Sequence, residues 1–457
     1  MVQYADLYLH KIMSEYKKHI TILGGGPAGM AVAFYAHEKG IEYSLFERSN
    51  RLGGNCITLE HNGFLFDSGA HRLHDKDPET TQIIKGLLGS ELELIHVPSQ
   101  IYREGRFIDF PLSPLNLLRF LGLFRFIHSA FQILYAKSKK NAVNEDFKSL
   151  VLHQYGKNIA ELFLLHYTEK LWGKPADALS TEVAGKRLKG LNLTTFMLEA
   201  IQGKKRKTRH LDGSFYYPKY GIGAIFEKMQ QHLNTGSIFL EHKVTSIRHE
   251  NNRIKEIIVN DGKEHMVQEL VCSLPIGVVL NILDPPPPSE ILELAKRIEF
   301  RDIILLGFFL DKESVNNNGS MYFPSERYRF TRIYEPRNRS VHMSPKGKTS
   351  LMVEIPCQRN EPIWNQDESL LLNEIAQKLI EAKLFTEDEL LDSCVYRVYN
   401  AYPILEKGYA ERVKPIYAYL SLFKNLHLTG RNGLFTYTHI HDHMVNGREV
   451  IDRLCHE

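Results

Sequence analysis

Gly24-Gly25-Gly26-Pro27-Ala28-Gly29 has the GxGxxG spacing of a turn that binds a pyrophosphate. In such a turn the first glycine allows the bend, the second lets the backbone approach the phosphates, and the third lets helix and strand pack closely. The helix that follows supplies N–H donors to the anion. Glu47 comes eighteen residues after Gly29, where an acid can accept hydrogen bonds from a ribose diol. A purely structural glycine turn is the alternative, and the order of the elements around the turn decides against it.

Those elements follow the order of a βαβ unit. Residues 18–23 form a short apolar run and predict a buried strand. Residues 30–39 are first small and apolar, then polar, and predict a helix that stops at Gly40. Residues 41–46 predict a second strand, which Glu47 closes. Strand, glycine turn, helix, strand and acid in this order are typical of a dinucleotide-binding fold.

A second group of polar and glycine residues follows the acid. Arg48 comes next, and Gly53, Gly54 and Asn55 lie a few residues further on. A second glycine pair at this distance lets another loop approach the same dinucleotide. This arrangement is seldom seen in plain NAD dehydrogenases.

Composition excludes several classes of protein. The chain has 457 residues, of which 43% are hydrophobic and 24% charged, as in a globular protein. The formal net charge of +3 is too small to argue for a nucleic-acid partner. Five cysteines without CxxC spacing predict a reducing compartment and no zinc ribbon. The first 18 residues lack the apolar stretch of a signal peptide, so we expect a cytoplasmic protein.

Further along, several segments resemble one superfamily of flavoproteins, which contains amine oxidases, protoporphyrinogen oxidases and UDP-galactopyranose mutases. The block from Glu47 to Asn55 is similar to its acid, Arg and Gly-Gly-Asn block. The other similar segments are Gly69-Ala70-His71, Tyr167-Thr168-Glu169-Lys170-Leu171-Trp172-Gly173, Tyr217-Pro218-Lys219-Tyr220-Gly221-Ile222-Gly223, Thr331-Arg332-Ile333, Ala401-Tyr402-Pro403, and Gly430-Arg431-Asn432-Gly433 followed by Tyr437. Together they cover most of the chain in order.

The resemblance implies an α/β fold with FAD as cofactor: a Rossmann-like, GR2-type FAD-binding domain with an inserted mixed α+β substrate domain and a helical subdomain. It places the FAD-binding domain at residues 18–80, 210–280 and 390–457, and the substrate-binding and helical insertions at 81–209 and 281–389. The residues it implies for FAD binding are Gly24, Gly26, Pro27, Ala28, Gly29, Glu47, Arg48, Gly53, Gly54, Asn55, His71, Val244, Gly430, Arg431 and Tyr437.

The substrate side rests on fewer residues. The resemblance implies catalytic roles for His71 and Arg332, and substrate contacts for Trp172, Arg332, Tyr402 and Tyr437. A guanidinium is suited to bidentate binding of a phosphate or carboxylate. Each of these side chains could instead be structural: a core histidine, a core tryptophan or an exposed strand arginine.

The chain also departs from the mutases. They carry an acid soon after the tyrosine that corresponds to Tyr437, where this chain has His439, His441, Asp442 and His443, and they carry Gln where this chain has Leu171. His and Asp side chains are common metal ligands. The cluster follows the flavin motif, however, so we expect polar contact with flavin or substrate and no metal.

Two segments raise the question of a surface role. The basic run at residues 204–209 could gate a phosphate or simply be a solvated loop. Residues 115–136 are apolar with Arg119, Arg125 and His128, and could lie on a membrane as in some porphyrinogen oxidases. We expect a buried helix of the substrate domain there, and no spanning helix, because no window of about 18 residues is free of charge.

Three functions remain open. The first is an FAD-dependent oxidoreductase that takes a hydride from a small-molecule substrate, in glycan or secondary metabolism. The second is a mutase-like isomerase that uses reduced FAD on a nucleotide-linked sugar with no net redox change. The third is a non-catalytic flavin-bearing partner protein, which the presence of Arg332 argues against. The altered segment after Tyr437 favours the first.

Overall fold

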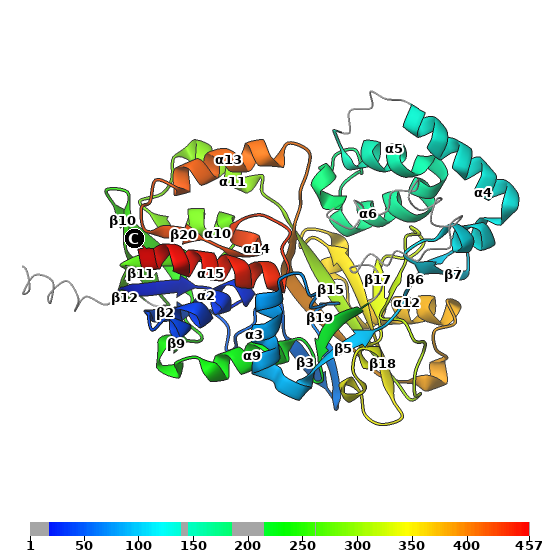
Figure 1. Cartoon of the computed structure of the whole chain (residues 1–457), viewed down its shortest axis with the longest axis horizontal. Helices are drawn as coiled ribbons and strands as arrows, with labels where there is room; N and C mark the ends of the chain where they lie inside the picture. The colour runs from blue at the N-terminus through cyan, green and yellow to red at the C-terminus, as the bar shows by residue number, and fades with distance from the viewer. Residues whose placement is uncertain (1–17, 139–144, 185–213, 261, 457) are drawn as a thin grey trace, which may run out of the picture.

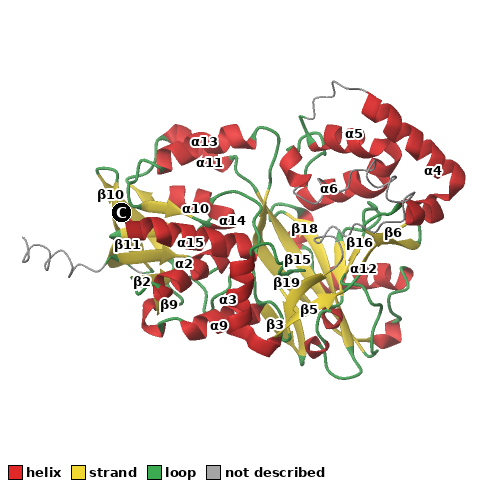
Figure 2. Ribbon diagram, viewed as in Figure 1, coloured by secondary structure: helices red, strands yellow, loops and turns green. Residues whose placement is uncertain are grey.

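The computed structural model describes residues 18–138, 145–184, 214–260 and 262–456. A parallel sheet covered by helices lies at one end of the molecule, a larger, mostly antiparallel sheet lies beside it, and a group of helices projects above the larger sheet (Figures 1 and 2). This α/β architecture agrees with the predicted fold class.

The parallel sheet contains the predicted βαβ unit. Its strand order is β20 (Leu426–Leu428), β13 (Glu269–Cys272), β1 (His19–Leu23), β2 (Glu42–Phe46) and β9 (Ile238–Phe239). α2 (Pro27–Glu38) connects β1 to β2, as the glycine turn and the apolar runs predicted. α15 (Ile440–His456) packs against α2 so closely that a Cβ on Gly447 would lie 2.9 Å from Ala31. Both chain ends therefore build the same layer.

A four-stranded sheet extends this end of the molecule. Its order is β12 (Lys263–Met266), β11 (Arg253–Val259), β10 (Val244–Glu250) and β14 (Leu283–Asp284). Side chains of α10 (Ile276–Asn281), α11 (Ser289–Lys296) and α13 (Tyr409–Leu420) share its apolar core. Residues 238–272 thus form a run of short strands.

The larger sheet forms the wall opposite the glycine turn. Its order is β19 (Leu390–Pro403), β15 (Phe300–Leu310), β18 (Thr349–Cys357), β17 (Arg332–Tyr334), β16 (Ser320–Tyr322), β6 (Ser99–Arg103) and β7 (Arg106–Phe110). β15 and β18 are almost continuously apolar because both of their faces are buried, with α12 (Glu368–Glu381) over one of them.

Smaller elements link the two sheets. They are β3 (Thr58–His61), β4 (Phe64–Asp67), α3 (Pro78–Leu88), β5 (Leu92–His96), β8 (Ser214–Pro218), α9 (Gly223–His232) and α14 (Gly430–Gly433). The strand β19 pairs along its length with β15, so residues 390–403 belong to the larger sheet. We therefore propose that the last FAD-domain segment begins after Pro403, and that α11 belongs with this domain.

The helical group differs from one expectation. It consists of α4 (Pro114–Ser138), α5 (Phe147–Ile159) and α6 (Leu165–Trp172). α4 was expected to be a buried helix, but only 28% of its most apolar window is buried. Of the described helices, it is the one that is long and apolar enough to cross a membrane by length and composition. The basic run at residues 204–209 lies outside the described residues.

Candidate FAD and substrate site

A cavity of about 370 Å³ lies where the parallel sheet meets the larger sheet. Leu23, Phe46 and Ser273 line it at the carboxyl ends of β1, β2 and β13, the edge where open parallel sheets bind ligands. Tyr322 and Arg332 line it from the opposite wall. The predicted site residues that line this one cavity are Gly24, Gly26, Pro27, Ala28, Glu47, Arg48, Gly54, Asn55, His71, Val244, Arg332, Tyr402, Gly430, Arg431 and Tyr437.

The two glycine loops contact each other at the edge of the cavity. A Cβ on Gly54, which has a φ of +54°, would lie 2.9 Å from the Cα of Gly26. Behind the turn, a Cβ on Gly29 would come within 1.9 Å of the Gly24 carbonyl oxygen, so Gly29 packs the helix and leaves the cavity to its neighbours. Gly53 also lies behind the surface and donates its N–H to the Gly25 carbonyl at 2.8 Å. A side chain at Gly54 would push the two loops apart, and a side chain at Gly29 would push the helix away from its own turn.

The carboxylate of Glu47 is fixed by its own chain. One oxygen accepts the Gly25 N–H at 2.7 Å, and the other accepts the N–H and hydroxyl of Ser49, each at 2.8 Å. An ionised carboxylate can accept about four hydrogen bonds, and three are used here. Glu47, which lines the cavity, can therefore accept a further hydrogen bond from a ligand. The geometry suits an acid that orients a diol.

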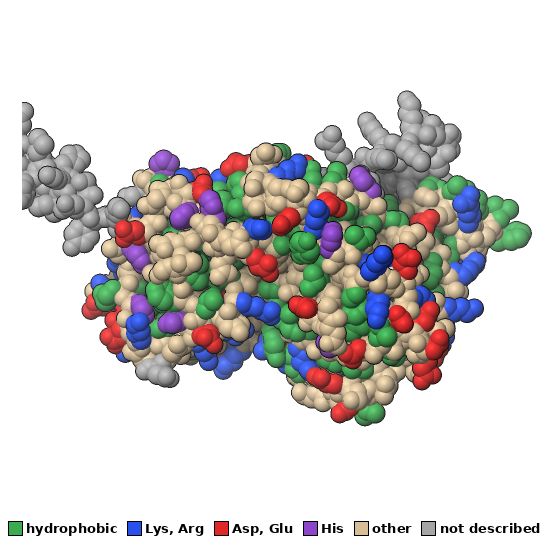
Figure 3. Space-filling view, turned by 90° about the horizontal axis from the view of Figure 1, so that it is seen from below, with side chains coloured by type: hydrophobic (Ala, Val, Ile, Leu, Met, Phe, Trp, Pro, Cys, Tyr) green, Lys and Arg blue, Asp and Glu red, His purple; other side chains and the backbone are tan. Residues whose placement is uncertain are grey.

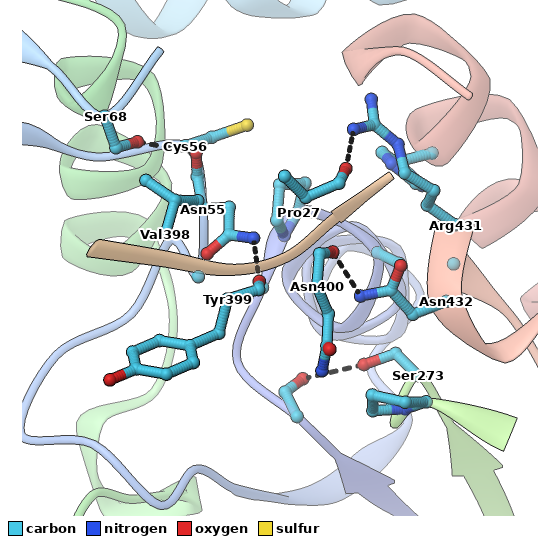
Figure 4. Close-up of a pocket in the computed structure, with 18 of the residues that line it drawn as sticks. Pro27, Asn55, Cys56, Ser68, Ser273, Val398, Tyr399, Asn400, Arg431 and Asn432 are labelled. Carbon is cyan, nitrogen blue, oxygen red and sulfur yellow. Dashed lines mark hydrogen bonds between the residues drawn. The ribbon is translucent and has the colours of Figure 1, made fainter. Parts of the chain in front are cut away.

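Asparagine side chains join the loops of the FAD-side wall to β19 (Figure 4). Asn55 donates to the Tyr399 carbonyl at 2.9 Å, and Asn432 donates to the Asn400 carbonyl at 3.2 Å. Ser68 donates to the Asn55 carbonyl at 2.7 Å. The backbone of β19 at residues 399 and 400, which the motif search did not single out, is therefore part of the site.

Three buried polar atoms on cavity-lining residues have no hydrogen-bond partner within the described protein: His71 Nε2, His443 Nδ1 and Asn432 Oδ1. A buried polar group left unsatisfied costs about 1–3 kcal/mol, and native proteins rarely tolerate one without a reason. Three such atoms on residues that line one cavity favour a ligand with several hydrogen-bonding groups in this site. An isoalloxazine ring carries such donors and acceptors along its edge.

His71 is held in a rigid turn. Arg339 donates to the His71 carbonyl at 3.0 Å, and Glu354 accepts the Ala70 N–H at 2.9 Å. Burial, with the charge of Arg431 as the next cause, lowers the pKa of His71 to about 3. The imidazole is therefore neutral near pH 7, with Nδ1 lying 3.9 Å from Cys56 Sγ.

Arg332 is already paired. Its Nε and Nη2 atoms donate to the two oxygens of Glu354 at 2.7 and 2.8 Å, across the β17–β18 pair. The Glu354 side chain is 3% exposed and the Arg332 side chain 13%. Motif reasoning missed Glu354, although an acid inside the otherwise apolar run 351–355 was a usable signal. Glu354 therefore neutralises the positive charge of Arg332, which we expected to bind a phosphate or carboxylate.

Arg431 contributes a positive charge that no carboxylate of the described residues pairs. It donates to the carbonyls of Ala401, at 2.8 Å, and of Thr438, at 3.2 Å from Nε. Its guanidinium carbon lies 5.0 Å from the ring centre of Tyr437 and 5.7 Å from that of Tyr402. Burial, followed by the charge of Tyr437, raises the pKa of Tyr402 to about 12, so its hydroxyl stays protonated.

Trp172 stands behind these tyrosines. Its ring centre lies 6.0 Å from that of Tyr402 and 6.2 Å from that of Tyr437, and it is buried in the core of the helical group. It does not line the cavity, unlike the other predicted substrate-binding residues. We therefore assign Trp172 a supporting position rather than a substrate contact.

The cluster after Tyr437 opens α15, so its side chains follow helical and not strand spacing. His439 and His443 line the cavity, while His441 pairs with Asp442 at 3.0 Å. Burial, then Arg431, lowers the pKa of His443 to about 3. Among the described residues, no group of three or more His, Cys, Asp or Glu side chains has the geometry of a metal site.

Comparison with known proteins identifies the family. The sequence model of flavin-containing amine oxidoreductases matches residues 27–435. The chain belongs to this family. Its cofactor is FAD, and the chain is an FAD-dependent oxidoreductase by family. The three polar atoms without a hydrogen-bond partner and the two close glycine contacts fit FAD as the ligand of this cavity.

Two relatives cover most of the chain and about half of it, respectively. It is 21% identical over 450 residues to the coproporphyrinogen III oxidase of Bacillus subtilis (strain 168), covering 92% of this chain and 94% of the relative. It is 23% identical to protoporphyrinogen oxidase 2 of Arabidopsis thaliana, over 54% of each chain.

Solved structures agree on the fold. Reduced UDP-galactopyranose mutase superposes with a TM-score of 0.85 at 19% identity, covering 96% of this chain and 94% of that one. Putrescine oxidase bound to putrescine superposes with a TM-score of 0.63 at 14% identity, covering 96% and 99%.

Proposed function

We propose that this chain oxidises a small-molecule substrate by passing a hydride to FAD, in glycan or secondary metabolism. When bound, FAD supplies the hydride-accepting chemistry, and the protein supplies position and charge. The observation that carries the proposal is the continuity of the cavity, from the dinucleotide turn at Gly24 to the wall of Tyr322, Arg332 and Tyr402.

The chain's own residues divide the work. We propose that Gly26, Gly54 and Glu47 hold the dinucleotide, and that His71, Asn432 and His443 meet the polar edge of the flavin or the substrate beside it. The neutral His71 can accept a hydrogen bond from the flavin or the substrate through whichever ring nitrogen is unprotonated. Arg431 then stabilises negative charge that develops in the cavity.

The runner-up is a mutase-like isomerase acting on a nucleotide-linked sugar. Arg332, Tyr402 and Tyr437 line one cavity, as such a function requires. The ion pair between Arg332 and Glu354 argues against it, because an arginine already bound to a carboxylate has little net charge left for a diphosphate.

An anaerobic experiment separates the two. The oxidised, FAD-loaded protein is mixed with coproporphyrinogen III and, separately, with UDP-galactopyranose, and the flavin absorption bands are followed. The dithionite-reduced protein is then incubated with UDP-galactopyranose, and the products are separated by chromatography. We expect bleaching by an oxidisable substrate and no isomerised sugar; isomerisation by the reduced protein without bleaching by any donor would replace the proposal with the runner-up.

A further inference from the structure

The helix α4 presents an exposed apolar face at the outer end of the helical group. Phe124 is 89% exposed and Phe131 65%, and the other large exposed side chains on this helix include Leu123, Ile127, Leu134 and Tyr135. Their spacing of three, four and seven residues puts most of them on one side. Hydrophobic side chains project from this end of the molecule in Figure 3. Such a contiguous patch is uncommon unless something covers it.

The other side of the helix is fixed in the protein. Leu117, Phe120 and Leu121 are buried and pack with α5 and the rest of the helical core. The backbone at Gly122 is non-helical, with φ 73° and ψ 167°, which kinks the helix in its first half. A kink exposes backbone groups that hydrocarbon cannot satisfy, and one side of the helix already packs on the protein. These two facts favour a helix that lies on a bilayer over one that crosses it.

Charge identifies what covers the face. The helix carries Arg119, Arg125 and Lys137 and no acidic residue. The hairpin before it carries Arg103 and Arg106 together with Glu104 and Asp109, so the net charge of this end of the molecule is positive. A second copy of the chain would meet this face with the same face, because a two-fold interface is self-complementary, and the cations would repel. The chain's own segment at residues 185–213 is a poor cover for the same reason, since it holds eight lysines and arginines against two acids.

We propose that α4 docks this protein on an anionic phospholipid surface, with its apolar face in the headgroup and acyl boundary and its cations among the headgroups. Buried apolar area and attraction to anionic lipid both contribute to such binding. Arg119 is exposed and contributes its full charge to this attraction. Arg125 contributes less, because it donates hydrogen bonds to both carboxylate oxygens of Glu104 at 3.1 and 3.2 Å.

The test is co-sedimentation of the FAD-loaded full chain with vesicles of phosphatidylcholine alone and of phosphatidylcholine mixed with phosphatidylglycerol. We expect binding to the mixed vesicles that weakens with salt. The double variant Phe124→Ser/Phe131→Ser should lose at least about tenfold in affinity, since each phenyl ring leaves an apolar environment. Arg119→Gln should lose about fivefold on the mixed vesicles only.

The matched control is Met266→Ser/Leu370→Ser, which removes two apolar side chains that are also more than 60% exposed, from β12 and α12. It should bind as the unmodified chain does, and all variants should keep their FAD and melting temperature. Absence of binding to either vesicle, or equal loss in the control, would overturn the proposal. So would a concentration-dependent dimer that the Phe124→Ser/Phe131→Ser variant abolishes, because the covering surface would then be a second copy.

Discussion

The ion pair between Arg332 and Glu354 offers the sharpest test of the site's electrostatics. Replacing Glu354 by Gln keeps the shape of the side chain and an acceptor for the Ala70 N–H, but removes the negative charge. Both partners are largely buried, so Arg332 is left as an uncompensated charge. Breaking such a pair costs about 3 kcal/mol or more in the free energy of unfolding. Spread over a chain of this length, that corresponds to a fall of about 3 °C in melting temperature.

The assay is thermal unfolding at saturating FAD, followed by flavin release and by circular dichroism. Glu374→Gln is the matched control, since Glu374 pairs with Arg329 at 3.2 Å on the surface, where an ion pair contributes under about 1 kcal/mol. The double variant Arg332→Gln/Glu354→Gln should be less destabilised than the sum of its two single changes. Glu354→Gln no more destabilised than the control, or strictly additive effects, would refute this reasoning.

Three further predictions concern separate parts of the molecule. Gly54→Ala should lower the FAD content of the purified protein, read from its absorption spectrum, because the new Cβ meets the Gly26 loop, whereas Gly86→Ala, which has open space, should not change it. The pKa values of His71 and His443 fall from 6.5 to about 3 on folding, so unfolded chains bind more protons between these values. The melting temperature should therefore fall as the pH drops from about 6.5 towards 3, and less steeply in His443→Asn. Lys170→Met should lower the melting temperature by several degrees, since Lys170 Nζ lies within hydrogen-bond distance of four carbonyl oxygens of the segment 323–330 and shares its three N–H donors among them.

Much of the nucleotide side was predictable because its signals are local. The glycine turn, α2 and β2 follow one another within about 30 residues, and the requirements at Gly29 and Gly54 are properties of short loops. A short apolar run that ends at a glycine also located β1.

The substrate side was less predictable because it depends on register and depth. Glu354 meets Arg332 only through the pairing of β17 with β18, which a single sequence does not specify. Trp172 lies one layer behind Tyr402 because α6 packs at that depth, and periodicity carries no such information. The exposure of α4 was not predicted for the same reason. The sequence pattern of an apolar helix is the same whether the helix is buried in the protein or exposed on its surface.

The most direct test of the central claim is an electron-density map of the FAD-bound protein. The account predicts the flavin ring in the cavity between Gly54 and Arg332, with His71 Nε2, Asn432 Oδ1 and His443 Nδ1 gaining hydrogen-bond partners from the flavin or from a molecule beside it. A flavin bound elsewhere, or a bound flavin that leaves all three atoms unpartnered, would contradict it.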